Sequence, residues 1–162
     1  MRKVHLILLA TAVGSLVLTA CQNNNRRQEL AYVERPVEQL YARATQEMDS
    51  RDYDQAILLF NEVERQHPYS EWARRSSLMS AFAAYESRKY DEAVSTAQRY
   101  LSLNPAGQGA SYAYYLIAVS HFDQIMDVGR DQRTTELARD ALLDVVRRYP
   151  ETDYARDATI KL

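Results

Sequence analysis

Cys21 is the only cysteine in the sequence, and its thiol is the side-chain group best suited to covalent chemistry. A lone cysteine cannot form a disulfide within the chain, and it has no second thiol for a redox pair. It lies in the stretch LTACQNNN, residues 18–25, between a mostly apolar run and a polar one rich in Gln and Asn. A redox or catalytic role is therefore not expected, and the flanking segments decide what the thiol does.

The other residue types used in catalysis and metal binding are scattered. His67 precedes Pro68 in an expected turn, and His121 is alone on an expected helix. No His, Cys and carboxylate side chains share the spacing of metal ligands, and no glycine-rich phosphate loop occurs. Glu62 and Glu64 are two positions apart, so they face different directions on a helix. We therefore expect no catalytic residues, no metal site, no cofactor and no enzyme.

The segment before Cys21 has the pattern of an export signal. A basic start is followed by an apolar stretch that small and polar residues interrupt, as in a signal peptide. Residues 18–21, Leu-Thr-Ala-Cys, resemble the lipobox of bacterial lipoproteins. The resemblance implies that residues 1–20 are removed and that Cys21 is acylated, which anchors the chain to a membrane. The alternative is an uncleaved N-terminal anchor with an incidental cysteine. In the sorting rule of these lipoproteins, Asp after the cysteine retains the protein at the inner membrane, so the resemblance together with Gln22 implies the outer membrane and its periplasmic face.

The remainder of the sequence divides into a tether and one helical domain. Residues 21–35 are polar and lack apolar periodicity, which predicts a lipidated tether. Residues 36–162 contain few helix breakers, since the whole chain has four glycines and four prolines. The formal net charge of −2 gives no electrostatic footprint for nucleic acid, so no nucleic-acid partner is expected.

An internal repeat organises residues 36–162. The segment RDYDQAILLFNEVERQHP at 51–68 resembles RKYDEAVSTAQRYLSLNP at 88–105, with Arg, Tyr, Asp, Ala and Pro at equivalent positions. A third copy ends at Pro150. The segments PYSEWA at 68–73 and PETDYA at 150–155 also match and predict the start of the following helix. A period near 34 residues is typical of tetratricopeptide repeats. The sequence therefore predicts an all-α, right-handed solenoid of helical hairpins, with about three repeats and the start of a fourth.

Apolar residues at helical spacing support this fold. Each of the three second helices is predicted to carry one apolar stripe at the 3.6-residue period: Tyr53, Ala56, Phe60 and Val63; Tyr90, Ala93, Ala97 and Tyr100; Leu137 or Ala138, Leu142, Val145 and Tyr149. The first helices align through Ala44, Ala81 and Ala118. Asp52 with Gln55 resembles a capping box, whereas Lys89 at the equivalent position cannot cap in that way.

The third repeat carries an insertion in or beside DVGRDQRTTE, residues 127–136. One interpretation is a lengthened helix pair joined by a loop. The other is a partner-contact loop that includes Arg130 and Asp131, because insertions in solenoids often map to one face.

Three stretches together resemble the BamD family, the lipoproteins of the outer-membrane β-barrel assembly machinery. They are HPYSEWA, AFAAYESRKYDEAVSTAQRYLSLNP and YAYYLIAVSHFDQIMDVGRDQRTTELARDALLDVVRRYPETDYARDA, within residues 36–162. The resemblance implies a non-enzymatic subunit that helps capture and insert outer-membrane protein precursors. It also implies partners: a BamA-type barrel subunit, other assembly lipoproteins, and the C-terminal segments of unfolded outer-membrane proteins. Members typically carry five repeats, whereas this sequence stops at ATIKL, so we expect C-terminal truncation.

In tetratricopeptide arrays the first helices line a concave groove. The usual groove positions predict a peptide-binding groove made of Tyr41, Arg75, Phe82, Tyr85, Tyr112, Tyr115 and Phe122. Aromatic side chains supply contact area, and an arginine can bind a carboxylate in a fork. The alternative is that these aromatic residues only pack between repeats.

A second function remains open for such a chain. Tetratricopeptide lipoproteins also act as scaffolds of other envelope complexes, as pilotins of secretion pores or as cell-wall organisers. A scaffold would hold folded partners without reading a peptide end. Dependence of binding on a free C-terminal carboxylate separates the two functions.

Overall fold

Polar caps and left-handed turns divide residues 35–162 into a series of helices. The computed structural model describes residues 35–125 and 132–162, where every regular element is an α-helix. These residues belong to one compact unit, Glu34–Leu162. In chain order the helices are α2 (Val37–Asp49), α3 (Tyr53–Gln66), α4 (Glu71–Glu86), α5 (Tyr90–Leu103), α6 (Ala110–Asp123), α7 (Gln132–Arg148) and α8 (Asp153–Lys161).

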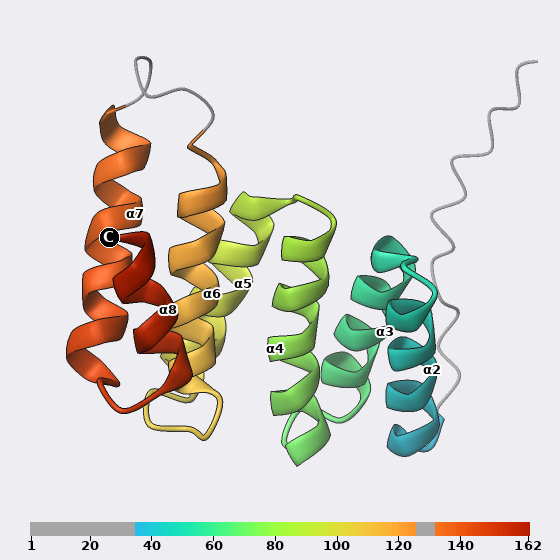
Figure 1. The fold of residues 1–162 in the computed structure, drawn as a ribbon. Coiled ribbons are helices and arrows are strands. Elements are labelled where there is room, and N and C mark those ends of the chain that lie inside the picture. Colours follow the sequence, from blue (N-terminus) through green and yellow to red (C-terminus); the bar gives the residue numbers. More distant parts are fainter. Residues whose placement is uncertain (1–34, 126–131) are drawn as a thin grey trace, which may run out of the picture. The chain divides into compact units, whose positions relative to one another are not determined.

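Each helix packs against the next, and the hairpins stack in a row (Figure 1). The first helices of successive hairpins also contact one another, as α2 with α4, α4 with α6 and α6 with α8. A single helical hairpin cannot bury its apolar face, so this stacking completes the core. The all-α repeat solenoid predicted from the sequence is confirmed.

The repeated Pro-x-Ser/Thr motif starts two of the first helices. The Ser70 side chain accepts a hydrogen bond from the Ala73 amide at 3.0 Å, and α4 begins at the next residue. Thr152 does the same for α8 through the Ala155 amide at 3.2 Å. A side-chain oxygen at this position satisfies an amide that the helix itself leaves unpaired.

The turns inside the first two hairpins are built alike. Arg51 and Arg88 adopt positive φ values of 63° and 61°. The amides of Arg51 and Asp52 donate to the carbonyls of Met48 and Glu47, respectively. In the second hairpin the amides of Arg88 and Lys89 make the equivalent hydrogen bonds. This is a Schellman motif, in which the left-handed residue lets the chain reverse after the helix.

Alanines and bulky apolar residues alternate in the core. Ala44, Ala81 and Ala118, through which the first helices align, are fully buried. Of the apolar stripes predicted for the second helices, the buried members are Ala56, Phe60 and Val63 in α3, Ala93, Ala97 and Tyr100 in α5, and Ala138, Leu142 and Val145 in α7. The stripe tyrosines Tyr53, Tyr90 and Tyr149 are only partly buried. Small residues let neighbouring helices approach closely while the larger ones fill the space between them.

Some local details differ from or refine the predictions. Pro36 is the N-cap of α2, at the start of the domain predicted to begin at residue 36. Ala138 rather than Leu137 belongs to the buried stripe, because Leu137 is 45% exposed. Asp52 accepts from the Gln55 amide at 3.2 Å, so it caps α3. Lys89 does not cap α5 and instead bonds Asp54 at 2.6 Å.

The insertion of the third repeat lengthens a helix. Ala138 of α7 and Ala93 of α5 occupy equivalent positions. Measured from these alanines, α7 starts at Gln132, about one helical turn earlier than α5 starts at Tyr90. Arg130 and Asp131, the predicted contact residues, lie outside the described residues. Among the helices that are described, none is long and apolar enough to cross a membrane.

Candidate functional site

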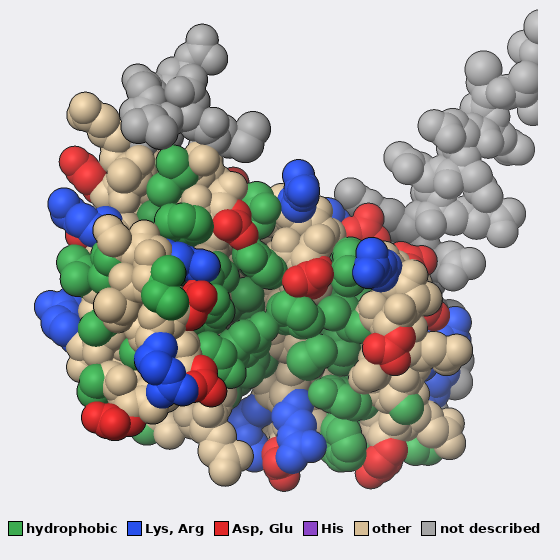
Figure 2. Space-filling view, in the orientation of Figure 1, with side chains coloured by type: hydrophobic (Ala, Val, Ile, Leu, Met, Phe, Trp, Pro, Cys, Tyr) green, Lys and Arg blue, Asp and Glu red, His purple; other side chains and the backbone are tan. Residues whose placement is uncertain are grey.

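The residues predicted to form the groove all lie on first helices. Tyr41 is on α2; Arg75, Phe82 and Tyr85 are on α4; and Tyr112, Tyr115 and Phe122 are on α6. The six aromatic residues are half-buried, whereas Arg75 is exposed. Figure 2 shows hydrophobic side chains gathered in the middle of this face. Cys21, the predicted lipidation site, lies outside the described residues.

Aromatic rings connect successive first helices. Phe82 of α4 lies edge-on to Tyr112 of α6, with ring centroids 6.3 Å apart. Tyr154 of α8 then contacts Tyr112 at 5.4 Å and Tyr115 at 5.2 Å. Contacts of this kind stabilise the stacking of hairpins and still leave part of each ring accessible. Packing between repeats therefore accounts for part of the aromatic content of this face.

Two tyrosines of the predicted groove also bind carboxylates of the next repeat. Tyr85 donates to Asp123 and Tyr115 donates to Asp157, each at 2.6 Å. Burial raises the pKa of both hydroxyls above the usual range, and the neighbouring carboxylates raise it further. Both groups stay protonated at neutral pH and remain donors, so their hydroxyls serve the stacking of the helices.

A hollow of about 610 Å³ opens on the first-helix side, and we call it the α4–α6 hollow. Its lining includes Arg74, Arg75 and Leu78 of α4, Tyr112 and the turn before α6. Figure 2 shows Lys and Arg side chains at the lower end of α4, beside the hydrophobic ones. Of the seven predicted groove residues, the hollow brings together Arg75 and Tyr112. Its volume is that of a typical small-ligand site.

The two arginines of the hollow differ in their partners. Arg75 pairs with Glu71 at 2.7 Å and lies over the Trp72 ring, 5.6 Å from its centroid. Arg74 forms no ion pair with any residue that the structure describes. Within the described ranges, the hollow thus carries one guanidinium whose charge no carboxylate neutralises.

The sequence analysis missed most of the residues that line the hollow, and four of them matter most for its shape and chemistry. They are Tyr100, Gly107, Gly109 and Tyr154. Tyr100 was assigned to the apolar stripe, where it is indeed buried, but its hydroxyl reaches the hollow. A usable signal was present, because two of the four glycines fall in the connection before α6.

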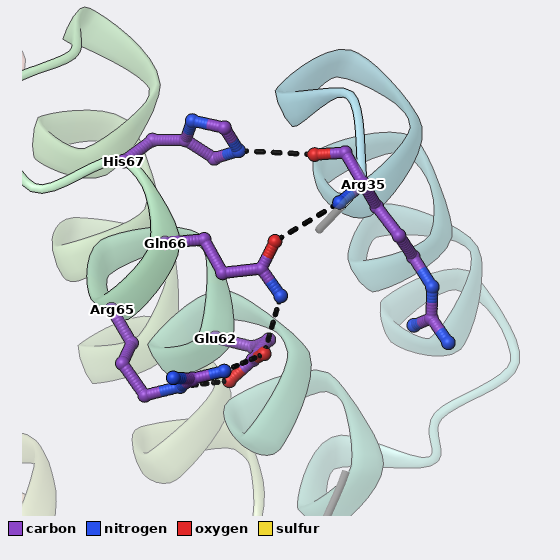
Figure 3. A network of polar contacts seen from close by, with 5 residues as sticks. All are labelled: Arg35, Glu62, Arg65, Gln66 and His67. Carbon is purple, nitrogen blue, oxygen red and sulfur yellow. Dashed lines mark hydrogen bonds and ion pairs between the residues drawn. The ribbon is translucent and has the colours of Figure 1, made fainter. Parts of the chain in front are cut away.

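A separate polar network holds the start of the repeat unit (Figure 3). The Arg35 amide donates to the Gln66 side chain at 3.1 Å, and the His67 ring bonds the Arg35 carbonyl at 3.0 Å. Glu62 is only 7% exposed and accepts from Arg65 and Gln66. The hydrogen bond from Arg65 lowers the pKa of Glu62, although burial opposes the shift. Glu62 and His67 therefore have structural partners, and the parts of the chain described contain no metal-binding cluster.

Comparisons with known proteins agree with this architecture. The family described as YfiO, outer membrane lipoprotein, matches residues 33–162. A curated relative from Caulobacter vibrioides, the outer membrane protein assembly factor BamD, is 46% identical over 156 residues, which is 96% of this chain and 51% of the relative.

Two further relatives bear the same name. The protein of Rickettsia prowazekii is 32% identical over 99% of this chain and 62% of its own length. The protein of Neisseria gonorrhoeae is 31% identical over 96% of this chain and 62% of its own length. The chain thus spans between half and two thirds of the length of these curated relatives.

Proposed function

The chain belongs to the YfiO family of outer membrane lipoproteins, and we propose that it acts as a non-enzymatic subunit of an outer-membrane protein assembly complex. Family membership means that it is an outer-membrane lipoprotein. Because the curated relatives are longer than this chain, its substrates and partners are part of the proposal.

The proposed activity is capture of the C-terminal segments of unfolded outer-membrane proteins. The observation that carries it is the half-buried aromatic face that leads to the cationic α4–α6 hollow. An extended segment with an aromatic last residue would place its ring against Tyr112 and its carboxylate near Arg75. Partly accessible aromatic rings supply contact area with few rotatable bonds, and guanidinium groups bind carboxylates strongly.

Membrane attachment would keep this capture close to the site of insertion. Cys21 is the proposed acylation site, and two or more acyl chains hold a protein firmly at a bilayer. Replacing Cys21 by Ala should move the protein from the membrane fraction to the soluble one.

The proposed partners within the complex are a BamA-type barrel subunit and other assembly lipoproteins. Arg130 and Asp131 in the third-repeat insertion are the proposed contact residues. Replacement of both by Ala should weaken co-purification of a partner while leaving the helical circular dichroism unchanged.

The test of capture is binding of the purified lipoprotein, in mild detergent, to a C-terminal peptide of a barrel protein. A scrambled peptide is the control. Preferred binding of the native peptide, weakened by Arg75→Ala, would support capture in the groove. The Arg75–Glu71 pair is exposed, so its loss should cost little stability. Equal weak binding of both peptides by folded protein would contradict capture and favour a scaffold for folded partners.

A further inference from the structure

We propose that the N-terminus of α6, the Tyr100 hydroxyl and Arg74 form a carboxylate-binding subsite in the α4–α6 hollow. The inference rests on the proposed function, because the carboxylate would be the free C-terminus of the captured segment. It identifies atoms that bind the chain end, beyond the general contribution of the aromatic face.

The first turn of α6 leaves amides unpaired at the hollow. Helix α6 begins after Gly109 without a side-chain cap, whereas α4 and α8 are capped by Ser70 and Thr152. The amides of Ser111 and Tyr112, in the first turn, have no hydrogen-bond partner among the described residues. Both residues line the hollow. Unpaired amides at a helix N-terminus, with the positive end of the helix dipole, favour an anion.

Tyr100 provides an independent indication of a ligand. Its side chain is 5% exposed, and its hydroxyl makes no hydrogen bond with any other described residue. The hydroxyl oxygen would lie 2.7 Å from a Cβ at Gly109 and 3.3 Å from one at Gly107, so it points at the turn that starts α6. The hydroxyl opens onto the hollow beside the unpaired amides, where an oxygen of a ligand could accept its hydrogen bond.

The absence of a side chain at Gly109 keeps these donors together. A Cβ at this position would lie 2.6 Å from a methyl carbon of Leu78 as well as against the Tyr100 hydroxyl. Any larger residue at this position would force the Leu78 or Tyr100 side chain to move, so glycine favours the close approach of the turn to α4 and α5. The close approach of the turn to α4 places the amide donors of α6 in the same hollow as Arg74 and Arg75 of α4.

The charge of the hollow selects an anion. Glu71 is engaged with Arg75 at 2.7 Å, which leaves Arg74 as the unneutralised cation. The proposed donors are two amides, a phenol and a guanidinium, and an acceptor with two oxygens and a negative charge satisfies them. The rings of Tyr112 and Tyr154 line the same hollow and would contact an aromatic last side chain. This combination fits a C-terminal carboxylate better than it fits inorganic phosphate, which would leave the rings unused.

The test compares a barrel C-terminal peptide as free acid with the same peptide amidated. Binding to the purified lipoprotein would be measured by fluorescence anisotropy. We expect amidation to weaken binding about tenfold, the effect of losing hydrogen bonds to a charged group. Tyr100→Phe and Arg74→Gln should each lower affinity for the acid and reduce its advantage over the amide. Neither side chain has a partner among the described residues to lose. Arg88→Gln, which removes an arginine outside the hollow that also pairs with no described residue, should leave binding unchanged.

The possible results separate the subsite from the capture function. Equal affinity for acid and amide in wild type would overturn the subsite and leave capture intact. If neither peptide bound, the capture function would be contradicted. The subsite would then be tested separately by titrating the protein with N-acetylphenylalanine and with its amide, and by following the NMR shifts of the Ser111 and Tyr112 amides. Shifts only with the acid would support it, and no shift would overturn it. Equal shifts with inorganic phosphate and with the acid would also overturn selection of a carboxylate.

Discussion

Tyr115 donates its hydroxyl hydrogen to Asp157 at 2.6 Å and thereby joins α6 to α8. The bond lowers the pKa of Asp157, and Lys161 lowers it further against the opposing effect of burial. A carboxyl whose pKa is lowered on folding contributes stability above its unfolded pKa, and this contribution is lost as the pH falls through the folded pKa. The attachment of α8 should therefore weaken in acid.

Replacing Tyr115 by Phe should loosen α8 without disturbing the ring contacts. We expect a loss of about 1 kcal/mol in the free energy of unfolding, at the low end for a hydrogen bond to a charged group because Asp157 is partly exposed. Hydrogen exchange of the α8 amides would detect the loosening directly. Tyr114→Phe is the control, since the Tyr114 hydroxyl bonds no other described residue. Equal effects of the two variants would contradict the role of the Asp157 bond.

Replacing Arg88 by Gly should stabilise the protein. Arg88 has a φ of 61° at the turn between α4 and α5, where a Cβ is unfavourable. The relief of strain exceeds the added flexibility of the unfolded chain, so we expect a gain of about 0.5–1 kcal/mol in the free energy of unfolding. Urea denaturation monitored by circular dichroism would measure it.

Arg88→Ala is the matched control, because it removes the charge and keeps the Cβ. It should leave stability near the wild-type value. A gain as large as that of the glycine variant would mean that charge, rather than backbone strain, determines the effect.

The repeat architecture was predictable because its signals recur along the chain. The motif that starts α4 and α8 contains the capping residues Ser70 and Thr152, which act locally. The alanines of the first helices recur in register, and the aligned positions Ala44, Ala81 and Ala118 are all fully buried. A periodic pattern of this kind reports the fold before any tertiary contact is known.

The hollow was only partly predictable, because its contacts occur once. Gly109 approaches both Leu78 of α4 and Tyr100 of α5, a meeting of three segments that no repeat encodes. Tyr100 fits the apolar stripe, and the unpaired state of its hydroxyl emerges only from the packed structure. Similarly, the spacing of Tyr85 and Tyr115 predicted groove positions but not their bonds to Asp123 and Asp157.

Replacing Ser76 by Ala should stabilise α4. Ser76 is fully buried, and its hydroxyl has no partner among the described residues. An unpaired buried hydroxyl is costly, so we expect a gain of about 1 kcal/mol in the free energy of unfolding, measured by urea denaturation. Ser80→Ala is the control, because the buried Ser80 hydroxyl donates to Asn61 at 3.0 Å and its loss should destabilise. If both variants destabilised, Ser76 would have a partner.

Glu62→Gln should reduce stability in a pH-dependent manner. Hydrogen bonding by Arg65 holds the pKa of Glu62 below its ordinary value of 4.5. Its charge therefore contributes stability above pH 4.5 that is lost as the pH falls through the lowered pKa. We expect a loss of about 2 kcal/mol in the free energy of unfolding at neutral pH, as for a buried hydrogen bond to a charged group. The difference from wild type should shrink in acid, and urea denaturation across this range would measure it.

The control for this variant is Glu71→Gln, which breaks an ion pair exposed on both sides. Its effect at neutral pH should be a few tenths of a kcal/mol, as is usual for surface pairs. A Glu62→Gln deficit that persisted unchanged in acid would assign the effect to packing of the side chain. A deficit that disappears in acid, together with faster hydrogen exchange at the Arg35 amide, would show that the charge of Glu62 positions Gln66 to hold the start of the repeat unit.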